Sequence, residues 1–157
     1  MLPQDSGVVY GQTLHQAMIG RRAMSEALAP KLKTRKQIRA LPTNELERVA
    51  SLTARLRSLS LFESLSDYEL AAVAEKGRIE HHAPGDVIIH QESTDKSFYV
   101  ILEGQVRVWK RDEEGGLHLL NYHGAGDFFG ELAPLYDQAR AANVDVVDDV
   151  DLVVFDE

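Results

Sequence analysis

The sequence contains no cysteine among its 157 residues. Disulfide bridges, thiolate nucleophiles and cysteine-ligated zinc sites are therefore excluded. It also lacks an apolar run long enough to span a bilayer and an N-terminal signal peptide, so we expect a cytoplasmic protein without a membrane span. The hydrophobic fraction of 44% is sufficient for a packed core.

Positive charge is scarce in the second part of the chain. Residues 61–157 carry seven Lys and Arg against 21 Asp and Glu, a net charge of −14, whereas residues 1–60 carry ten against four, a net charge of +6. We therefore divide the chain into a basic helical arm or linker, residues 1–60, and an acidic domain, residues 61–157. We expect no direct binding of nucleic acid by the acidic domain, because phosphate backbones require a positive surface.

Helices are expected in the arm. The basic stretch Arg21–Arg39 is interrupted by Pro30, which ends or kinks a helix. After Pro42, apolar residues recur at helical spacing, and Asn44 with Glu47 has the pattern of a capping box. This pattern predicts an amphipathic helix that packs on the neighbouring domain.

A second, shorter helix is expected at the start of the acidic domain. Ser66 and Glu69 have the spacing of a capping box, and Leu65 is placed for a hydrophobic staple. Gly77 is expected to end this helix.

Short segments rich in Val, Ile, Tyr and Phe alternate with turn residues after Gly77, and the last two are Asn143–Val147 and Val150–Phe155. A short helix at Gly130–Leu135 interrupts these seven or eight segments. The spacing predicts a mainly β fold with flanking helices, an eight-stranded antiparallel jelly-roll (β-roll) barrel.

The segment Phe128–Val144, FFGELAPLYDQARAANV, contains the most informative chemistry. Gly130 permits a close approach to a ligand, and the free N–H groups at the start of the expected helix suit an anionic oxygen. Arg140, the only Lys or Arg after Arg111, offers a planar fork for phosphate oxygens. Glu131 would repel a phosphate, so it is better explained as an acceptor for a hydroxyl group. The combination describes a sugar hydroxyl beside a phosphate.

The part FGELAPLYDQARAANV resembles, without gaps, the phosphate-binding cassette of the cyclic nucleotide-binding domain family, F-G-E-L-A-L-x-x-x-x-P-R-A-A-T-V. The upstream segments LFESLSDYEL, PGDVIIHQ, FYVILEGQVRV and GAGDFFGE follow in the family's order, so the resemblance covers about Leu59 to Glu157. It implies a β-roll of about eight strands that binds cAMP or cGMP, with cAMP favoured, and no metal or other cofactor.

The resemblance also assigns roles to individual residues. Glu131 would bind the ribose 2′-hydroxyl and Arg140 the cyclic phosphate, while Asn143 stands where a Thr or Ser of some relatives contacts guanine. Gly104 and Gly126 match structural glycines of the family. The residues expected at the ligand are Gly130, Glu131, Leu132, Ala133, Arg140, Ala141, Ala142 and Asn143.

The sequence departs from the family pattern in three places. Pro134 and Ala139 replace a common leucine and proline of the cassette. Glu92 and Asp95 stand in a loop where the family often has glycines, so this loop should be stiffer. Family members continue into C-terminal lid helices, which the sequence lacks after its last segment VVFDE, so we expect a fragment of a longer protein or a lid supplied by another chain.

The function implied by the resemblance is that of a cyclic nucleotide sensor. Ligand binding would move the flanking helices, packed through Phe62, Leu65 and Leu70, and thereby switch an attached or partner effector such as a kinase, a channel or another output domain. An oligomer formed through the N-terminal helices is compatible with this role. Two alternatives stay open, a ligand-independent protein-interaction scaffold with a degenerate fold, and the sensor part of a truncated transcription regulator. We expect no enzymatic activity, because no catalytic motif is present.

Simpler interpretations stand beside some of these assignments. Arg140 could pair only with a nearby carboxylate, for which Asp137, Asp145 and Asp148 are candidates. The segment Arg21–Ser25, RRAMS, resembles a kinase pseudosubstrate, but Met24 holds the acceptor position, so a basic helix face explains it better. His81 and His82 are adjacent and would face opposite sides of a strand, and His118 and His123 lack a carboxylate partner at ligand spacing, so no metal site is expected.

Overall fold

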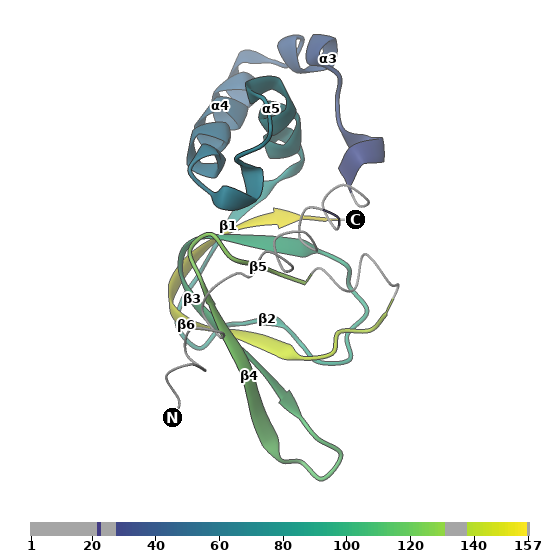
Figure 1. Ribbon diagram of the computed structural model, residues 1–157, viewed down its shortest axis with the longest axis vertical. Helices are drawn as coiled ribbons and strands as arrows, with labels where there is room; N and C mark the ends of the chain where they lie inside the picture. The colour runs from purple at the N-terminus through teal and green to yellow at the C-terminus, as the bar shows by residue number, and fades with distance from the viewer. Residues whose placement is uncertain (1–21, 23–27, 131–137, 157) are drawn as a thin grey trace.

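The computed structural model describes residues 22, 28–130 and 138–156. A helical layer, built from the N-terminal part of these residues, lies against an antiparallel β-structure (Figure 1). The helices are η1 (Ala29–Lys31), α3 (Arg35–Arg39), α4 (Thr43–Arg57), η2 (Ser60–Phe62) and α5 (Asp67–Lys76). The strands are β1 (Arg78–His82), β2 (Val87–Ile89), β3 (Phe98–Arg111), β4 (Leu117–Gly124), β5 (Phe128–Phe129) and β6 (Asn143–Phe155). In this described part of the chain, no helix has the length and apolar character needed to cross a membrane.

The amphipathic helix expected after Pro42 is confirmed as α4, but its predicted capping box is wrong. The helix begins at Thr43, so Asn44 lies inside its first turn, and no side chain caps it. The carbonyl of Pro42 instead accepts the first helical hydrogen bond, from the backbone N–H of Leu46 at 2.9 Å. Pro42, with a ψ of 154°, is thus itself the N-cap residue, and its ring has no oxygen that could cap the helix.

The capping box of α5 is confirmed in both directions. The Ser66 hydroxyl accepts from the N–H of Glu69 at 3.1 Å, and the Glu69 carboxylate accepts from the N–H of Ser66 at 3.0 Å. The helix ends at Lys76, before Gly77, as expected. Gly77 has a φ of −91°, so the left-handed conformation is not the reason for this glycine. A Cβ atom there would lie 2.6 Å from Cγ1 of Val153, and its absence lets the end of α5 pack on β6.

The strands form one antiparallel sheet in the order β1-β6-β3-β4, with β2 paired to β6 and β5 paired to β3. A mainly antiparallel β-structure with flanking helices is therefore confirmed. The eight strands and the closed barrel are not: the described residues contain six strands in an open sheet.

The difference in strand count arises because two long strands bend without breaking. The sequence predicted Asn143–Val147 and Val150–Phe155 as separate strands, but β6 runs through both, and β3 likewise passes through Gly104 with shifts of register against β6. Gly104 has a φ of +93°, and a Cβ atom there would lie 2.1 Å from the carbonyl oxygen of Asp149. The glycine thus lets β3 and β6 bend together while they remain paired.

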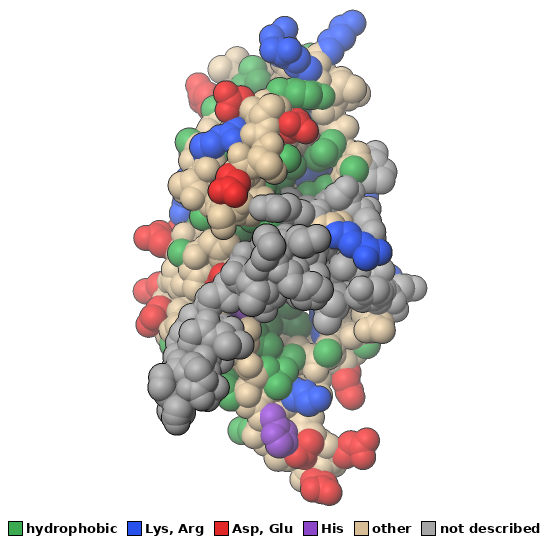
Figure 2. Space-filling view, in the orientation of Figure 1, with side chains coloured by type: hydrophobic (Ala, Val, Ile, Leu, Met, Phe, Trp, Pro, Cys, Tyr) green, Lys and Arg blue, Asp and Glu red, His purple; other side chains and the backbone are tan. Residues whose placement is uncertain are grey.

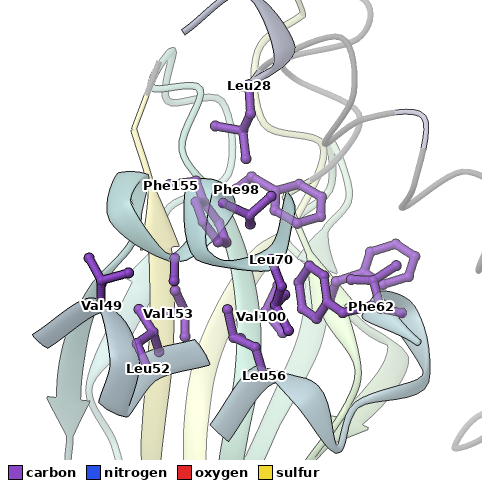
Figure 3. Close-up of a cluster of buried hydrophobic side chains, with 14 residues drawn as sticks. Leu28, Val49, Leu52, Leu56, Phe62, Leu70, Phe98, Val100, Val153 and Phe155 are labelled. Carbon is purple, nitrogen blue, oxygen red and sulfur yellow. The ribbon is translucent and has the colours of Figure 1, made fainter. Parts of the chain in front are cut away.

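Two clusters of buried side chains lie on opposite faces of the central strands. The first joins the helices to the sheet, with Leu56 of α4 and Leu70 of α5 packed near Val100 and Phe155 (Figure 3). The second lies on the other face and includes Tyr99, whose ring stacks on Phe129 at 4.8 Å between centroids. The strands therefore separate the helical core from the face that forms the candidate site.

Candidate functional site

Arg140 lies just before β6, and only 5% of its surface is exposed. Its guanidinium group donates four hydrogen bonds. Nη2 donates to Oδ1 of Asp95 at 2.7 Å and to the carbonyl of Ser97 at 2.6 Å, while Nε donates to Oδ2 of Asp95 at 3.3 Å. Nη1 donates to the carbonyl of Gly130 at 2.9 Å. The side chain is thus held at a fixed place by acceptors from the chain itself.

The loop between β2 and β3 positions these acceptors. Its backbone pairs with Arg140: the N–H of Arg140 donates to the carbonyl of Ser93 at 2.8 Å, and the N–H of Glu92 donates to the carbonyl of Arg140 at 2.7 Å. Glu92 has a φ of +71°, a value that favours glycine. The hydrogen bond from Arg140 is the main cause that holds the pKa of Asp95 below its ordinary value of 3.8, against the opposing effect of burial. Asp95 is therefore an ionised partner of Arg140 at neutral pH.

Position 130 requires a glycine for two reasons, its backbone conformation and the lack of space for a side chain. Its φ is +85°, and a Cβ atom would lie 2.8 Å from the carbonyl oxygen of Ser97 and 3.0 Å from Nη1 of Arg140. No other residue can bring its backbone so close to the guanidinium group.

A cavity of about 220 Å³ lies beside Arg140. Its walls are mostly apolar, and Arg140 supplies a positive charge among them. The lining residues are Ile89, Val108, Leu120, His123, Phe129, Gly130, Gln138, Ala139, Arg140, Ala141, Ala142 and Val144. The cavity therefore brings together four of the predicted site residues, Gly130, Arg140, Ala141 and Ala142.

Asn143 lies at the start of β6, where its side chain binds the protein. Its Oδ1 accepts from the N–H of Gln91 at 2.8 Å, and its Nδ2 donates to Oε1 of Gln91 at 3.3 Å. The carboxamide of Gln91 also exchanges hydrogen bonds with the backbone of Arg111. Asn143 thus joins the loop after β2 to β6, and its contact with a nucleotide base stays a prediction.

Three predicted site residues, Glu131, Leu132 and Ala133, lie outside the described residues, as does the greater part of the short helix expected at Gly130–Leu135. Their roles stay predictions. No group of His, Asp and Glu side chains that could hold a metal ion occurs within residues 28–130 and 138–156.

The carboxylate that pairs with Arg140 was missed by the sequence analysis. Asp145, one of the proposed partners, pairs with Arg107 at 2.6 Å. Asp95 stands in the loop that was singled out only for its lack of glycines. The sequence did place a carboxylate in this loop, 45 positions before the lone arginine. Only the fold shows that Asp95 and Arg140 lie in contact.

Comparisons with known proteins show which family the chain resembles. The family model described as "Cyclic nucleotide-binding domain" matches residues 79–157. A cAMP-dependent protein kinase regulatory subunit of Hypocrea atroviridis is 39% identical over 95 residues, which are 60% of this chain and 20% of the relative. The cGMP-dependent protein kinase, isozyme 1, of Drosophila melanogaster is 36% identical over 104 residues, 63% of this chain and 13% of the relative. The chain thus spans a fifth or less of the length of these two relatives.

Solved structures show the same arrangement. The regulatory domain of Toxoplasma gondii PKA with cAMP has a TM-score of 0.66 and 27% identity, covering 71% of this chain and 43% of that one. The regulatory subunit of a cAMP-independent protein kinase A from Trypanosoma brucei has a TM-score of 0.68 and 28% identity, covering 73% and 42%. Since the family model matches half of the chain, this protein belongs to the cyclic nucleotide-binding domain family.

Proposed function

We propose that this chain is a cyclic nucleotide sensor, with cAMP the preferred ligand, that regulates a protein kinase. One observation carries the proposal: the buried guanidinium group of Arg140 lies at an apolar cavity beside Gly130. A buried, permanently charged group that opens onto a cavity is suited to a cyclic phosphate, while the apolar walls are suited to a base. The relative with 39% identity, a cAMP-dependent kinase regulatory subunit, supports both the ligand and the kinase.

Phosphate binding is an exchange of acceptors at Arg140. The guanidinium group now donates to Asp95, Ser97 and Gly130. A cyclic phosphate would accept the hydrogen bonds that Asp95 accepts, because both groups present two negatively charged oxygens to the guanidinium fork. Glu131 would accept from the ribose 2′-hydroxyl, and the backbone amides of Leu132, Ala133, Ala141 and Ala142 would complete the phosphate site.

The strand β5 offers a short route from the site to the helices. Phe129 lines the cavity, whereas its neighbour Phe128 points to the other face, where its ring stacks on Phe98 at 5.8 Å. Phe98 and Phe128 belong to the same buried cluster as Leu56 and Leu70 of the helices. A movement of Gly130 on ligand binding would therefore be transmitted to α4 and α5, which gives a two-state switch.

Calorimetric titration of the chain with cAMP, cGMP and guanosine tests the proposal. We expect saturable binding of cAMP, weaker binding of cGMP, and a loss of at least about 100-fold in affinity for Arg140→Ala, corresponding to about 2.7 kcal/mol. Arg107→Ala is the matched control, because Arg107 is a half-exposed arginine paired with Asp145 on the same sheet. The proposal fails if neither cyclic nucleotide binds, or if both variants bind as the wild type does.

A second candidate function is a regulatory scaffold that does not respond to cyclic nucleotides. Two observations favour it. The guanidinium hydrogen bonds of Arg140 are already made within the chain. A kinase regulatory subunit from Trypanosoma cruzi, described as cAMP-independent and bound to guanosine, has a TM-score of 0.68 and 26% identity, covering 73% of this chain and 40% of that one. Binding of guanosine alone in the same titration would support this candidate.

A further inference from the structure

The short helix α3 and the turn before it carry positive charge that the protein itself does not neutralise. Lys31, Arg35, Lys36 and Arg39 are exposed, and within the described residues none of their side chains forms an ion pair. Lys33, in contrast, pairs with Glu75 at 3.1 Å. Helix α3, which carries three of these cations, lies at the end of the molecule away from the β3–β4 hairpin (Figure 1). This cationic end, Lys31–Arg39, is available to an acidic partner.

An apolar groove adjoins the cationic end. It has a volume of about 480 Å³ and lies between η1, η2 and α5. Lys33 and Thr34 stand at its edge. The apolar side chains that line it include Leu28, Leu32, Leu61, Phe62, Leu65 and Val73. A partner that fits this region would present both negative charge and exposed apolar side chains.

The hairpin between β3 and β4 has both properties. Glu113 and Glu114 are exposed in its turn, and neither side chain has an ion-pair partner within the described chain. Leu117 and Leu119 follow on β4 and are 63% and 56% exposed. Since β4 is the last strand in the sheet order, no strand of the described residues covers its outer edge. Large exposed leucines at such an edge are typical of an interaction surface.

Arg111, the cation nearest the turn in sequence, is engaged with other groups. Arg111 is turned back, with its guanidinium group over the ring of Trp109 at 5.7 Å and its Nη1 donating to the carbonyl of Gly115 at 3.2 Å. The acidic side chains of Glu113 and Glu114 therefore form the outermost part of the hairpin. Figure 2 shows red side chains at this end of the molecule and blue ones at the opposite end.

We propose that the hairpin tip of one copy, residues 112–119, docks on the cationic end and apolar groove of a second copy. The acidic turn would face Lys36 and Arg39, and Leu117 with Leu119 would enter the groove. Because the two surfaces lie at opposite ends of one molecule, they cannot meet within a single chain (Figure 1). The contact therefore joins two copies, which either make it twice in a closed antiparallel pair or leave one free surface of each kind for further copies.

The association must be weak and sensitive to salt. Exposed ion pairs contribute little one by one and are screened beyond a Debye length of about 10 Å at 0.1 M salt. The leucines supply the contribution that salt does not screen. The proposal does not depend on nucleotide binding, so it can be tested on the chain without ligand.

Sedimentation velocity of the full chain over a range of protein concentrations tests the proposal. It is measured at about 0.05 M salt, where the Debye length exceeds about 10 Å, and at about 0.5 M salt, where it is shorter. We expect species larger than the monomer at low salt and an apparent dissociation constant at least about tenfold higher at high salt. The double variant Glu113→Lys/Glu114→Lys, and separately Lys36→Glu/Arg39→Glu, should each remain monomeric at low salt. A mixture of the two variants should associate again, because the acidic hairpin of the second meets the basic α3 of the first.

Asp148→Lys/Asp149→Lys is the matched control. These two carboxylates are adjacent and exposed like Glu113 and Glu114. They lie far from the hairpin turn, because Asp148 stands opposite Gln105 in the β3–β6 register, about 20 Å along β3 from the turn. This control should associate as the wild type does. Leu117→Ser/Leu119→Ser should weaken association at both salt concentrations.

Three outcomes would overturn the proposal. The wild type could stay monomeric at low salt, the hairpin variant could associate as the wild type does, or the mixed variants could fail to associate although each is folded by circular dichroism. An association that depends on Lys36 and Arg39 but not on the hairpin would assign the cationic end to another acidic surface.

Discussion

Asp95 and Arg140 form a two-point ion pair across the candidate phosphate site, with Nη2 2.7 Å from Oδ1 and Nε 3.3 Å from Oδ2. The two partners differ in exposure: the arginine side chain is 3% exposed, whereas the aspartate side chain is 46% exposed. The guanidinium group is therefore fixed, and the carboxylate can move into solvent. A ligand phosphate would compete with Asp95 for the same donors.

The first prediction concerns this competition. Asp95→Asn keeps the size of the side chain but removes its negative charge, so it should release Arg140 to a phosphate and increase the affinity for cAMP. We expect an increase of about tenfold, corresponding to about 1.4 kcal/mol. Calorimetric titration of the variant measures it directly.

The control for this substitution is Glu92→Gln, which removes a carboxylate from the same loop. Glu92 is exposed, and only its backbone N–H contacts Arg140. Its substitution should leave the affinity unchanged within about twofold, as expected for an exposed charge. Weaker binding by Asp95→Asn would contradict the competition and show that Asp95 serves mainly to position the arginine.

The second prediction concerns pH and stability. The Arg140 hydrogen bond lowers the pKa of Asp95 below 3.8, so the folded protein binds the proton less readily than the unfolded chain. The pair therefore stabilises the fold fully at a pH above the unfolded pKa of about 3.9, and this contribution is lost as the pH falls through the folded pKa. Urea unfolding from pH 7 to pH 3 should show a stability difference between wild type and Asp95→Asn that shrinks in acid. If the free energies of unfolding of the two proteins changed with pH in parallel, this contribution would be ruled out.

The third prediction concerns Gly130. Gly130→Ala places a Cβ atom 2.8 Å from the carbonyl oxygen of Ser97 and 3.0 Å from Nη1 of Arg140, at a φ of +85°. We expect a loss of more than about tenfold in cAMP affinity, or about 1.4 kcal/mol, because Arg140 must shift. Calorimetric titration measures the affinity for cAMP, and urea unfolding measures the stability of the variant.

Gly85→Ala separates the backbone effect from the steric one. Gly85 has a similar φ of +93°, but no atom lies within 4 Å of the added Cβ position. Both substitutions carry the cost of a left-handed alanine, about 1–2 kcal/mol. Only Gly130→Ala should also impair binding, and equal binding by the two variants would count against a steric role for Gly130.

Features that depend on residues close in sequence could be predicted well. The Ser66–Glu69 capping box involves two side chains three positions apart, and the structure contains it as predicted. The end of α5 at Gly77 was predicted too, although its cause was not, since the glycine is needed to pack against Val153. The prediction at Asn44 was wrong because the helix begins at Thr43, with Pro42 as its N-cap residue, so Asn44 lies inside the first turn.

Features that depend on distant residues could not be predicted. The continuity of β3 through Gly104 is decided by its pairing with β6, which begins almost 40 positions later. The bonds of Arg140 to Asp95 and of Asn143 to Gln91 cross 45 and 52 positions, and the sequence analysis proposed neither Asp95 nor Gln91 as a partner. Tertiary packing, not local preference, determines all three.

The fourth prediction concerns the coupling of helices and sheet. Leu70 is fully buried in the cluster that joins α5 to β3 and β6, so Leu70→Ala should lower the free energy of unfolding by about 2–5 kcal/mol. Leu117→Ala is the matched control, because Leu117 is 63% exposed, and at low protein concentration it should change stability by less than about 0.5 kcal/mol.

The helices and the sheet should also unfold together in both variants, because they share one buried cluster. Far-UV circular dichroism reports mainly on α4 and α5, while the fluorescence of Trp109, the single tryptophan, reports on β3. Coincident urea transitions by the two probes are expected for a cooperative unit. If the helical signal were lost at a lower urea concentration than the fluorescence signal, the helices would be an independent unit, and a movement of Gly130 could not be transmitted to them through Phe128 and Phe98.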